Sequence, residues 1–212
     1  MSLGKKALLV VLSIILIDQI VKIYIKTHFN YGDSKEIFGW FVINFIENPG
    51  MAFGWVIGGS FGKLALSIFR ILAIVAIGWY LVNIVKAKAN TGLVICVALI
   101  LAGAVGNILD SAFYGLIFDK GLIYDPLTRE WQSYYGIAHL GHHGYAGFLK
   151  GSVVDMLYFP IIQNGHFPQW LPIWGGESFI FFHPTFNIAD SSISIGVASI
   201  VLFQKRFFKH EN

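Results

Sequence analysis

The sequence predicts an all-α integral membrane protein with four transmembrane helices, a small external β subdomain and an extended external insertion. Of its 212 residues, 56% are hydrophobic and 13% are charged, whereas a soluble domain usually carries about 25% charged residues. The chain contains four long apolar stretches, and neither internal repeats nor clear linkers divide it. We therefore expect a single membrane domain over residues 1–212.

Four stretches are long and apolar enough to cross about 30 Å of hydrocarbon as helices. Their approximate limits are 7–25, 64–85, 92–114 and 186–203. The first follows Lys5 and Lys6, as the apolar part of a signal peptide would, but it contains Asp18 and Lys22 and has no small-residue cleavage site. We therefore expect this first span to remain uncleaved.

The basic residues predict that both termini are cytoplasmic, because lysine and arginine are enriched on that side of membrane proteins. The segments on the other side, about 26–63 and 119–185, contain slightly more acids than bases and are expected to be external. The basic residues on the predicted cytoplasmic side are Lys5, Lys6, Lys86, Lys88, Lys205, Arg206 and Lys209.

A small sheet is predicted in the first external segment. Residues 37–53 alternate apolar and aromatic residues in short runs around the turn residues Asn48, Pro49 and Gly50. Short alternating runs bounded by such residues favour strands on the membrane surface over another span.

The first span contains an acid and a base in a favourable arrangement. Asp18 and Lys22 lie four residues apart, on one helical face, with the acid nearer the N-terminus. Ionisable residues inside a span are costly and are functional candidates for that reason. The pair either tethers this helix to its neighbours or contacts a substrate directly. In the second span, Arg70 is expected to snorkel or pair near the outer end.

The third span carries a polar stripe. Gly103, Asn107, Asp110 and Tyr114 recur at helical spacing. An amide both donates and accepts, so Asn107 could bridge a substrate backbone, position a carboxylate or link helices. Asp110 is expected to cap or orient its neighbours.

The outer end of the fourth span carries a second stripe, made of Asn187, Asp190, Ser191 and Ser194. Asp190 is either functional or a favourable acid near a helix N-terminus. Asp155 is the other acid embedded in apolar sequence on this side. A solvated loop would explain Asp155 poorly, because its flanking residues are apolar.

Two carboxylates brought together near a membrane surface suggest amide hydrolysis. Neighbouring like charges cannot both ionise easily, so such a pair shares a proton. One member then activates a water as a base, and the other polarises the carbonyl as an acid. This chemistry requires no metal and no cofactor. Spacing alone does not pair Asp155 with Asp190, and Asp18, Asp110 and Asp119 remain alternatives.

Four sequence boxes, in order and each near a span end, resemble those of the prolipoprotein signal peptidases, the type II signal peptidases of bacteria. The likeness extends from about residue 12 to residue 197. The boxes are Asp18-Gln19-Ile20-Val21-Lys22, Glu47-Asn48-Pro49-Gly50-Met51-Ala52-Phe53-Gly54, Gly103-Ala104-Val105-Gly106-Asn107-Ile108-Leu109-Asp110, and the pair Val153-Val154-Asp155 with Phe186-Asn187-Ile188-Ala189-Asp190-Ser191.

The resemblance implies an intramembrane aspartyl endopeptidase whose catalytic aspartates fall on Asp155 and Asp190. It would remove the signal peptide of a prolipoprotein just before a cysteine that already carries diacylglycerol. The implied location is the bacterial inner membrane, among membrane lipids, with the active site near the outer face. The residues expected to bind substrate or support the site are Asp18, Lys22, Asn48, Gly50, Gly103, Asn107, Asp110 and Asn187.

The chain is expected to act as a monomer, since the family needs one chain per site. No nucleic-acid partner is expected, because the net charge is only +3 and no basic run is interleaved with aromatics.

Three departures distinguish the chain from the resembled family. Ser111 stands where an arginine usually follows the acid of the third-span box, and Arg129 or Lys150 could supply the missing cation. About 37 extra residues, near 116–152, make Asp119 a rival to Asp155, although the residues around Asp155 match the family better. Third, an aromatic-rich stretch from 159 to 182 could form a lip over the site.

The insertion also contains His139, His142 and His143, a spacing that a zinc site could use. Glycines surround these histidines and no acidic or cysteine ligand is adjacent, so a surface loop is favoured. Two other classes of protein remain open. A small proton- or cation-coupled transporter could use the intramembrane acids, and a membrane adaptor could hold them for structural reasons.

Overall fold

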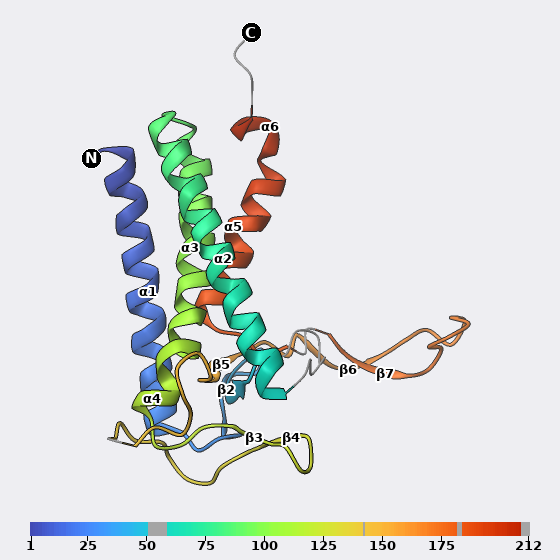
Figure 1. The fold of residues 1–212 in the computed structure, drawn as a ribbon. Helices are drawn as coiled ribbons and strands as arrows, with labels where there is room; N and C mark the ends of the chain where they lie inside the picture. Colours follow the sequence, from blue (N-terminus) through green and yellow to red (C-terminus); the bar gives the residue numbers. More distant parts are fainter. Residues whose placement is uncertain (51–58, 142, 182–183, 209–212) are drawn as a thin grey trace.

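The computed structural model describes residues 1–50, 59–141, 143–181 and 184–208. Four apolar helices run side by side, and the small sheets lie together at one end of them (Figure 1). The N-terminus and the last described residues, up to 208, lie at the opposite end, beside the connection between the second and third helices (Figure 1). The four helices are α1 (Leu3–His28), α2 (Gly59–Lys86), α3 (Thr91–Leu109) and α5 (Ile188–Leu202).

Three segments are long and apolar enough to cross a membrane, namely Leu3–His28, Phe61–Lys86 and Thr91–Ile117. The protein is therefore a multi-pass membrane protein. The predicted fourth span is shorter than expected: α5 has 15 residues, a length of about 22 Å at 1.5 Å per residue. A short helix, α6 (Gln204–Phe207), follows it.

Helices α1 and α2 expose large apolar side chains along their outer faces. Leu8, Leu12 and Leu16 are exposed on α1, and Phe69 and Leu72 are exposed on α2. In water these side chains would form a costly apolar surface, whereas in a bilayer they contact lipid.

The third span changes its winding within its polar stripe, at Asp110. After α3, the chain forms a π-helix over Asp110–Tyr114 and a last short helix, α4, over Gly115–Ile117. A π-helical turn accommodates an extra residue and shifts the side chains that follow it. The segment predicted as one continuous span is thus a helix with a π turn at its functional end.

Helices α3 and α5 pack closely because small residues face each other between them. A side chain at Gly103 would collide with the Ala189 carbonyl oxygen and would lie 2.6 Å from Ile193 Cγ1. Farther along the same interface, a side chain at Gly196 would lie 2.7 Å from the Cys96 carbonyl oxygen. Close backbone approach through small residues is a common way for membrane helices to associate.

The predicted small sheet is present. Strands β1 (Ser34–Phe38), β2 (Phe41–Asn48) and β5 (Val153–Tyr158) form one antiparallel sheet in the order β1-β2-β5. In its register, Ile46 pairs with Asp155. Asp155 therefore lies on a strand, whereas the predicted sheet covered only residues 37–53; residues 51–53 lie outside the described part of the chain.

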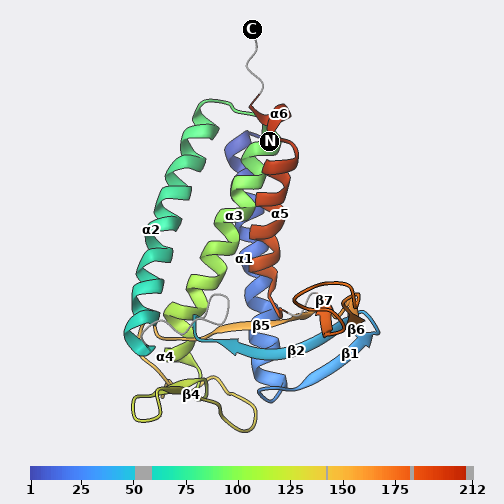
Figure 2. The same cartoon turned by 90° about the vertical axis from the view of Figure 1, so that its right-hand side faces the viewer.

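Two further hairpins follow. Strands β3 (Ile123–Asp125) and β4 (Glu130–Gln132) belong to the insertion, which lies beyond the ends of the helices (Figure 2). Strands β6 (Ile162–His166) and β7 (Ser178–Phe181) form the second hairpin. The aromatic-rich stretch that suggested a lip forms this hairpin, which extends sideways from the bundle (Figure 1).

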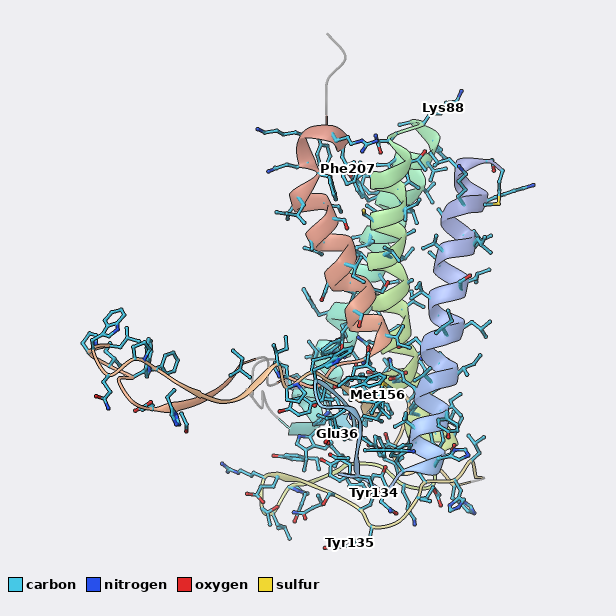
Figure 3. The ribbon with its side chains drawn as sticks, turned by 180° about the vertical axis from the view of Figure 1, so that it is seen from behind. Glu36, Lys88, Tyr134, Tyr135, Met156 and Phe207 are labelled. Atoms are coloured by element: carbon cyan, nitrogen blue, oxygen red, sulfur yellow. The ribbon has the colours of Figure 1, made fainter. Side chains whose placement is uncertain are left out.

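The two ends of the molecule have different cores. Ala7, Leu81, Leu93, Val94 and Val97 belong to an apolar cluster between α1, α2 and α3. The other cluster, where the insertion meets the sheet, contains Ile25, Phe45, Tyr114, Phe118, Ala138, Val154 and Met156. Figure 3 shows Lys88 and Phe207 at the first end, and Glu36, Tyr134 and Met156 at the second.

Gly103→Ala should destabilise the protein by about 1–3 kcal/mol, because the added methyl overpacks the contact between α3 and α5. Gly78→Ala is the matched control, since a methyl group there meets nothing within 4 Å and the substitution favours a helix by up to about 1 kcal/mol. Both effects are measured as changes in the free energy of unfolding of the two variants in mixed micelles. A loss of equal size in the two variants would contradict the close α3–α5 contact.

Candidate active site

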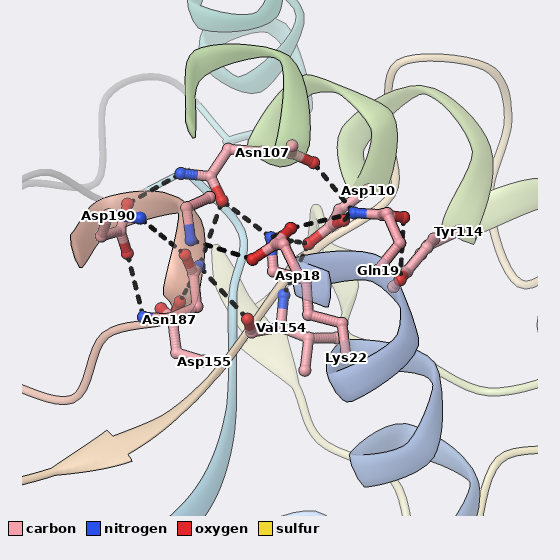
Figure 4. Close-up of polar contacts among 12 residues, drawn as sticks. Asp18, Gln19, Lys22, Asn107, Asp110, Tyr114, Val154, Asp155, Asn187 and Asp190 are labelled. Carbon is pink, nitrogen blue, oxygen red and sulfur yellow. Dashed lines mark hydrogen bonds and ion pairs between the residues drawn. The ribbon is translucent and has the colours of Figure 1, made fainter. Parts of the chain in front are cut away.

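The polar residues of the spans meet where the helix bundle joins the sheet. Helices α1, α3 and α5 each contribute side chains, and β5 passes beneath them (Figure 4). These residues come from three of the four sequence boxes, and their partners are up to 171 positions apart in the chain.

Lys22 is the centre of this network. Its Nζ lies 2.9 Å from Asp18 Oδ2, 2.9 Å from Asp110 Oδ2 and 2.9 Å from Asn107 Oδ1. An ammonium group has three donors, and all three are used. Lys22, Asp18 and Asp110 are fully buried, so each charge depends on the others for neutralisation.

The carboxylates of the two acids also attach the network to other elements. Asp18 Oδ1 accepts the backbone N–H of Ala189 at 2.9 Å, which holds the first turn of α5 against α1. Asp110 Oδ2 accepts the backbone N–H of Val154 at 3.2 Å, which holds β5 against the end of α3. The predicted tethering role of Asp18 and the orienting role of Asp110 both agree with these contacts.

Gln19 is a member of this network that the sequence did not single out as a site residue. Its Nε2 donates to Asp110 Oδ1 at 2.8 Å and to Asp18 Oδ2 at 3.1 Å, and Tyr114 donates its hydroxyl to Gln19 Oε1 at 3.2 Å. The only signal in the sequence was a polar residue beside Asp18 within an apolar span. Gln19 is therefore a second link between the two acids, in addition to Lys22.

Asn107 connects this network to Asp190 and fixes the direction from which Asp190 is contacted. Its Oδ1 accepts from Lys22, so its amide nitrogen must point the other way. That nitrogen donates to Asp190 Oδ1 at 2.7 Å. Of the roles that the sequence left open for Asn107, the geometry supports the positioning of a carboxylate.

Asn187 lies between the two acids of the proposed dyad (Figure 4). Its Nδ2 donates to Asp155 Oδ1 at 2.6 Å, and its backbone N–H donates to Asp190 Oδ2 at 3.3 Å. Its Oδ1 accepts the backbone N–H of Asp190 at 2.9 Å, which completes a capping box at the start of α5. One residue therefore both begins the helix and contacts both carboxylates.

The two acids have different surroundings. Asp155 is buried on β5. Burial raises the pKa of Asp155 to about 8, and the negative charge of neighbouring Asp190 acts in the same direction. Asp190 is half-buried and lines a cavity of about 370 Å³ with Phe186, Ser191, Ser194 and Ile195. An acid with a raised pKa thus lies beside an acid that is open to a cavity.

The remaining predicted residues lie around this centre. Asn48 ends β2 opposite Val153, and its Oδ1 accepts the backbone N–H of Gly50 at 2.8 Å. Gly50 has φ +103°, a conformation that favours glycine. Gly103 contacts α5 through its backbone and contributes packing to the site.

The structure separates the rival acid from the cluster. Asp119 accepts the backbone N–H of His139 in the insertion, and its side chain is 37% exposed. Asp18 and Asp110 contact Lys22, which leaves Asp155 and Asp190 as the pair that Asn187 joins.

The position of the missing arginine is filled by Ser111, which is buried and donates to the Asn107 carbonyl oxygen at 3.2 Å. Arg129 lies in the turn between β3 and β4, and Lys150 lines a different cavity. Arg70 on α2 interacts electrostatically with Asp190, Asp155 and Asp110. The sequence analysis expected Arg70 to snorkel or pair and did not connect it with these acids.

The histidine cluster is described only in part, because His142 lies outside the described residues. His139 and His143 are exposed, and His139 Nδ1 lies 3.6 Å from Asp119 Oδ2. Among residues 1–50, 59–141, 143–181 and 184–208, no group of three or more histidine, cysteine or acidic side chains could hold a metal ion.

Comparison with known proteins decides the family. Residues 10–206 match the family described as signal peptidase (SPase) II. The chain belongs to this signal peptidase family. It is therefore a protease, and the family resemblance that the four boxes suggested is confirmed.

Named relatives agree with this assignment. The chain is 43% identical over 206 residues to the lipoprotein signal peptidase of Porphyromonas gingivalis, a match that covers 96% of this chain and 84% of the relative. It is 35% identical over 194 residues to the lipoprotein signal peptidase of Amoebophilus asiaticus, covering 89% and 72% of the two chains.

Two solved structures, both described as bacterial membrane enzymes studied by the in meso method, share the fold. The structure at 1.9 Å is 25% identical with a TM-score of 0.57 and covers 97% of this chain and 94% of its own. The structure at 2.3 Å is 23% identical with a TM-score of 0.58 and covers 98% and 93%.

Lys22→Met should lower the free energy of unfolding by about 3–5 kcal/mol, because it leaves two buried carboxylates of this signal peptidase without a cation. The double variant Lys22→Met/Asp110→Asn should recover part of that loss, since it removes one of the two charges. The free energies of unfolding of the purified single and double variants are compared, with Asp110→Asn alone as the control. A double variant less stable than Lys22→Met would contradict this account of the network.

Proposed function

We propose that this protein removes the signal peptide from diacylglyceryl-modified prolipoproteins, cleaving just before the lipidated cysteine. Asp155 and Asp190 are the catalytic pair. The observation that carries the proposal is the position of Asn187, which contacts both carboxyl groups at once. Relatives that match most of the chain bear the name lipoprotein signal peptidase, which is the basis for the substrate class.

The unequal surroundings of the two acids assign their roles. Asp190, open to the cavity, takes a proton from a water molecule while the water oxygen attacks the scissile carbonyl carbon. Asp155 keeps its proton at neutral pH and donates it to the carbonyl oxygen. When the tetrahedral intermediate collapses, the C–N bond breaks and the leaving nitrogen takes the proton held by Asp190. One hydroxyl of the intermediate returns its proton to Asp155 as the carbonyl re-forms, which restores both acids to their starting states.

The supporting residues hold the pair in this arrangement without reacting. Asn107 fixes one oxygen of Asp190, and Lys22 fixes Asn107. The tether from Asp110 to Val154 holds the strand next to Asp155. Hydrolysis gains rate from such preorganised contacts, because no group needs to move when charge develops.

The substrate reaches the pair from the lipid side. Phe186 and Ile195 make part of the wall of the cavity beside Asp190 apolar, and exposed Val197 and Val201 continue along α5. A signal peptide and an acyl chain are both apolar, so this surface suits them. Asn48 and Gly50, at and just beyond the end of β2, support the substrate backbone in this proposal.

The orientation follows from the charges at the two ends. The bundle end that carries both termini also carries Lys5, Lys6, Lys86 and Lys88. We place this end in the cytoplasm of the bacterial inner membrane, so that the dyad lies near the outer face. Residues 1–212 act as one membrane domain and as a monomer.

Replacing either catalytic acid should stop cleavage. We expect Asp155→Asn and Asp190→Asn each to reduce kcat by at least about a hundredfold with a diacylated precursor in a reconstituted assay. Asp119→Asn is the matched control and should keep its activity, because Asp119 contacts His139 in the insertion. Full cleavage by either dyad variant would overturn the mechanism, as would loss of activity in Asp119→Asn alone.

The pH dependence should report the proton on Asp155. Because the reaction needs this carboxyl protonated, kcat/KM should fall as pH rises through about 8 and should drop about tenfold per further pH unit. The thermal unfolding midpoint, measured above pH 8, is the control for loss of the fold. Asp155 is then ionised in both the folded and the unfolded chain, so it adds no further pH dependence to stability. Constant kcat/KM up to pH 10 would exclude Asp155 as the acid.

A further inference from the structure

Lys63 is a second basic residue of α2, on the same helical face as Arg70, and it lies outside the contacts of the catalytic pair. Lys63 is only 5% exposed. Its Nζ donates to Ser152 Oγ at 3.2 Å and lies 4.7 Å from the centre of the Trp131 ring. A buried ammonium normally pairs with an acid, yet no acid of the described chain lies within 4 Å of Lys63 Nζ.

Glu47, whose charge acts on Lys63, already has partners of its own. Glu47 forms a buried ion pair with Lys26. Its Oε1 also accepts the Tyr134 hydroxyl at 2.7 Å, and its Oε2 accepts the backbone N–H of Leu122 at 3.1 Å. Lys26 pairs with Glu47, so this acid is not available as the partner of Lys63.

Lys63 faces an open cavity that its own charge makes suitable for an anion. The cavity has a volume of about 260 Å³ and lies between α2 and the insertion. Lys150 also lines it, and the aromatic rings of Tyr124 and Trp131 form part of its wall. The described residues that line it include two lysines and no acid.

The residues around the cavity are of the kinds found at a membrane surface. Phe61, two residues before Lys63, is 79% exposed, and Ile123 on the cavity wall is 54% exposed. Tyrosine and tryptophan are enriched where lipid headgroups meet the acyl chains. An anion that binds here has apolar protein surface beside it, which suits the headgroup of a lipid better than a free ion.

We propose that this cavity binds the phosphate group of an anionic phospholipid from the outer leaflet, with Lys63 and Lys150 as its cationic partners. The site is separate from the dyad and goes beyond peptide cleavage. Bound phosphate would give Lys63 the counter-ion that the described chain lacks. Because Ser152 directly precedes β5, the lipid would also anchor the insertion next to the strand that carries Asp155.

The test titrates the full-length protein in an uncharged detergent and follows its unfolding midpoint. We expect a saturable rise with phosphatidylglycerol, and no comparable rise with phosphatidylcholine or with inorganic phosphate at equal ionic strength. Lys63→Met and Lys150→Met should each weaken the apparent affinity about fivefold, the effect of about 1 kcal/mol per membrane-facing lysine. Lys35→Met, which removes an exposed lysine from β1, is the matched control and should behave as the parent.

Four outcomes would overturn the proposal. Equal stabilisation by phosphatidylcholine would show that the lipid charge is irrelevant, and equal stabilisation by inorganic phosphate would show an ion site without lipid. An equal loss in Lys35→Met would show general charge attraction. Unchanged affinity in Lys150→Met would exclude the cavity even if Lys63→Met did not fold, because the Lys150 side chain is exposed. None of these measurements depends on peptide cleavage, so they stand apart from the proposed function.

Discussion

The rest of the structure depends on the neutralisation of Lys22. A fully buried ammonium inside a membrane helix must have partners, and Lys22 finds three on α1 and α3. Because all three of its donors are used, the geometry of its partners is fixed as well. Asn107 can then present only its amide nitrogen to Asp190. A costly charge in the membrane thereby sets the orientation of a carboxylate on a different helix.

Asp155, the second acid, is held in position by a different element. Asp155 follows the insertion in the chain and is carried by β5, which pairs with β2. The link from Asp110 to Val154 joins this strand to α3, and Asn187 joins it to α5. Asp155 is therefore buried by the sheet, while Asp190 stays open to a cavity. Different scaffolds give the two acids the unequal surroundings that an acid and a base require.

The helical part of this arrangement could be predicted from the sequence, because the helical spacing of the polar and charged residues can be seen within each single segment. The i,i+4 spacing of Asp18 and Lys22 and the stripe through Asn107 and Asp110 both predict faces that the structure uses. The strand position of Asp155, the link made by Gln19 and the contact between Lys63 and Trp131 could not be predicted. These contacts join residues far apart in the chain, and they depend on how the elements pack. The predicted fourth span is longer than α5, because the helix begins only after its Asn187 cap.

The distribution of polar groups along the bundle favours a peptidase over a transporter. The ionisable network lies at the end that meets the sheet (Figure 4). At the end with the termini, the described core between α1, α2 and α3 is apolar, with Leu81, Ile84, Leu93 and Val97 buried in it. A proton or cation pathway needs polar groups or water throughout the depth of the membrane. A hydrolase needs them only at the surface where its water and substrate meet, and the helices below it serve as a rigid, lipid-solvated support.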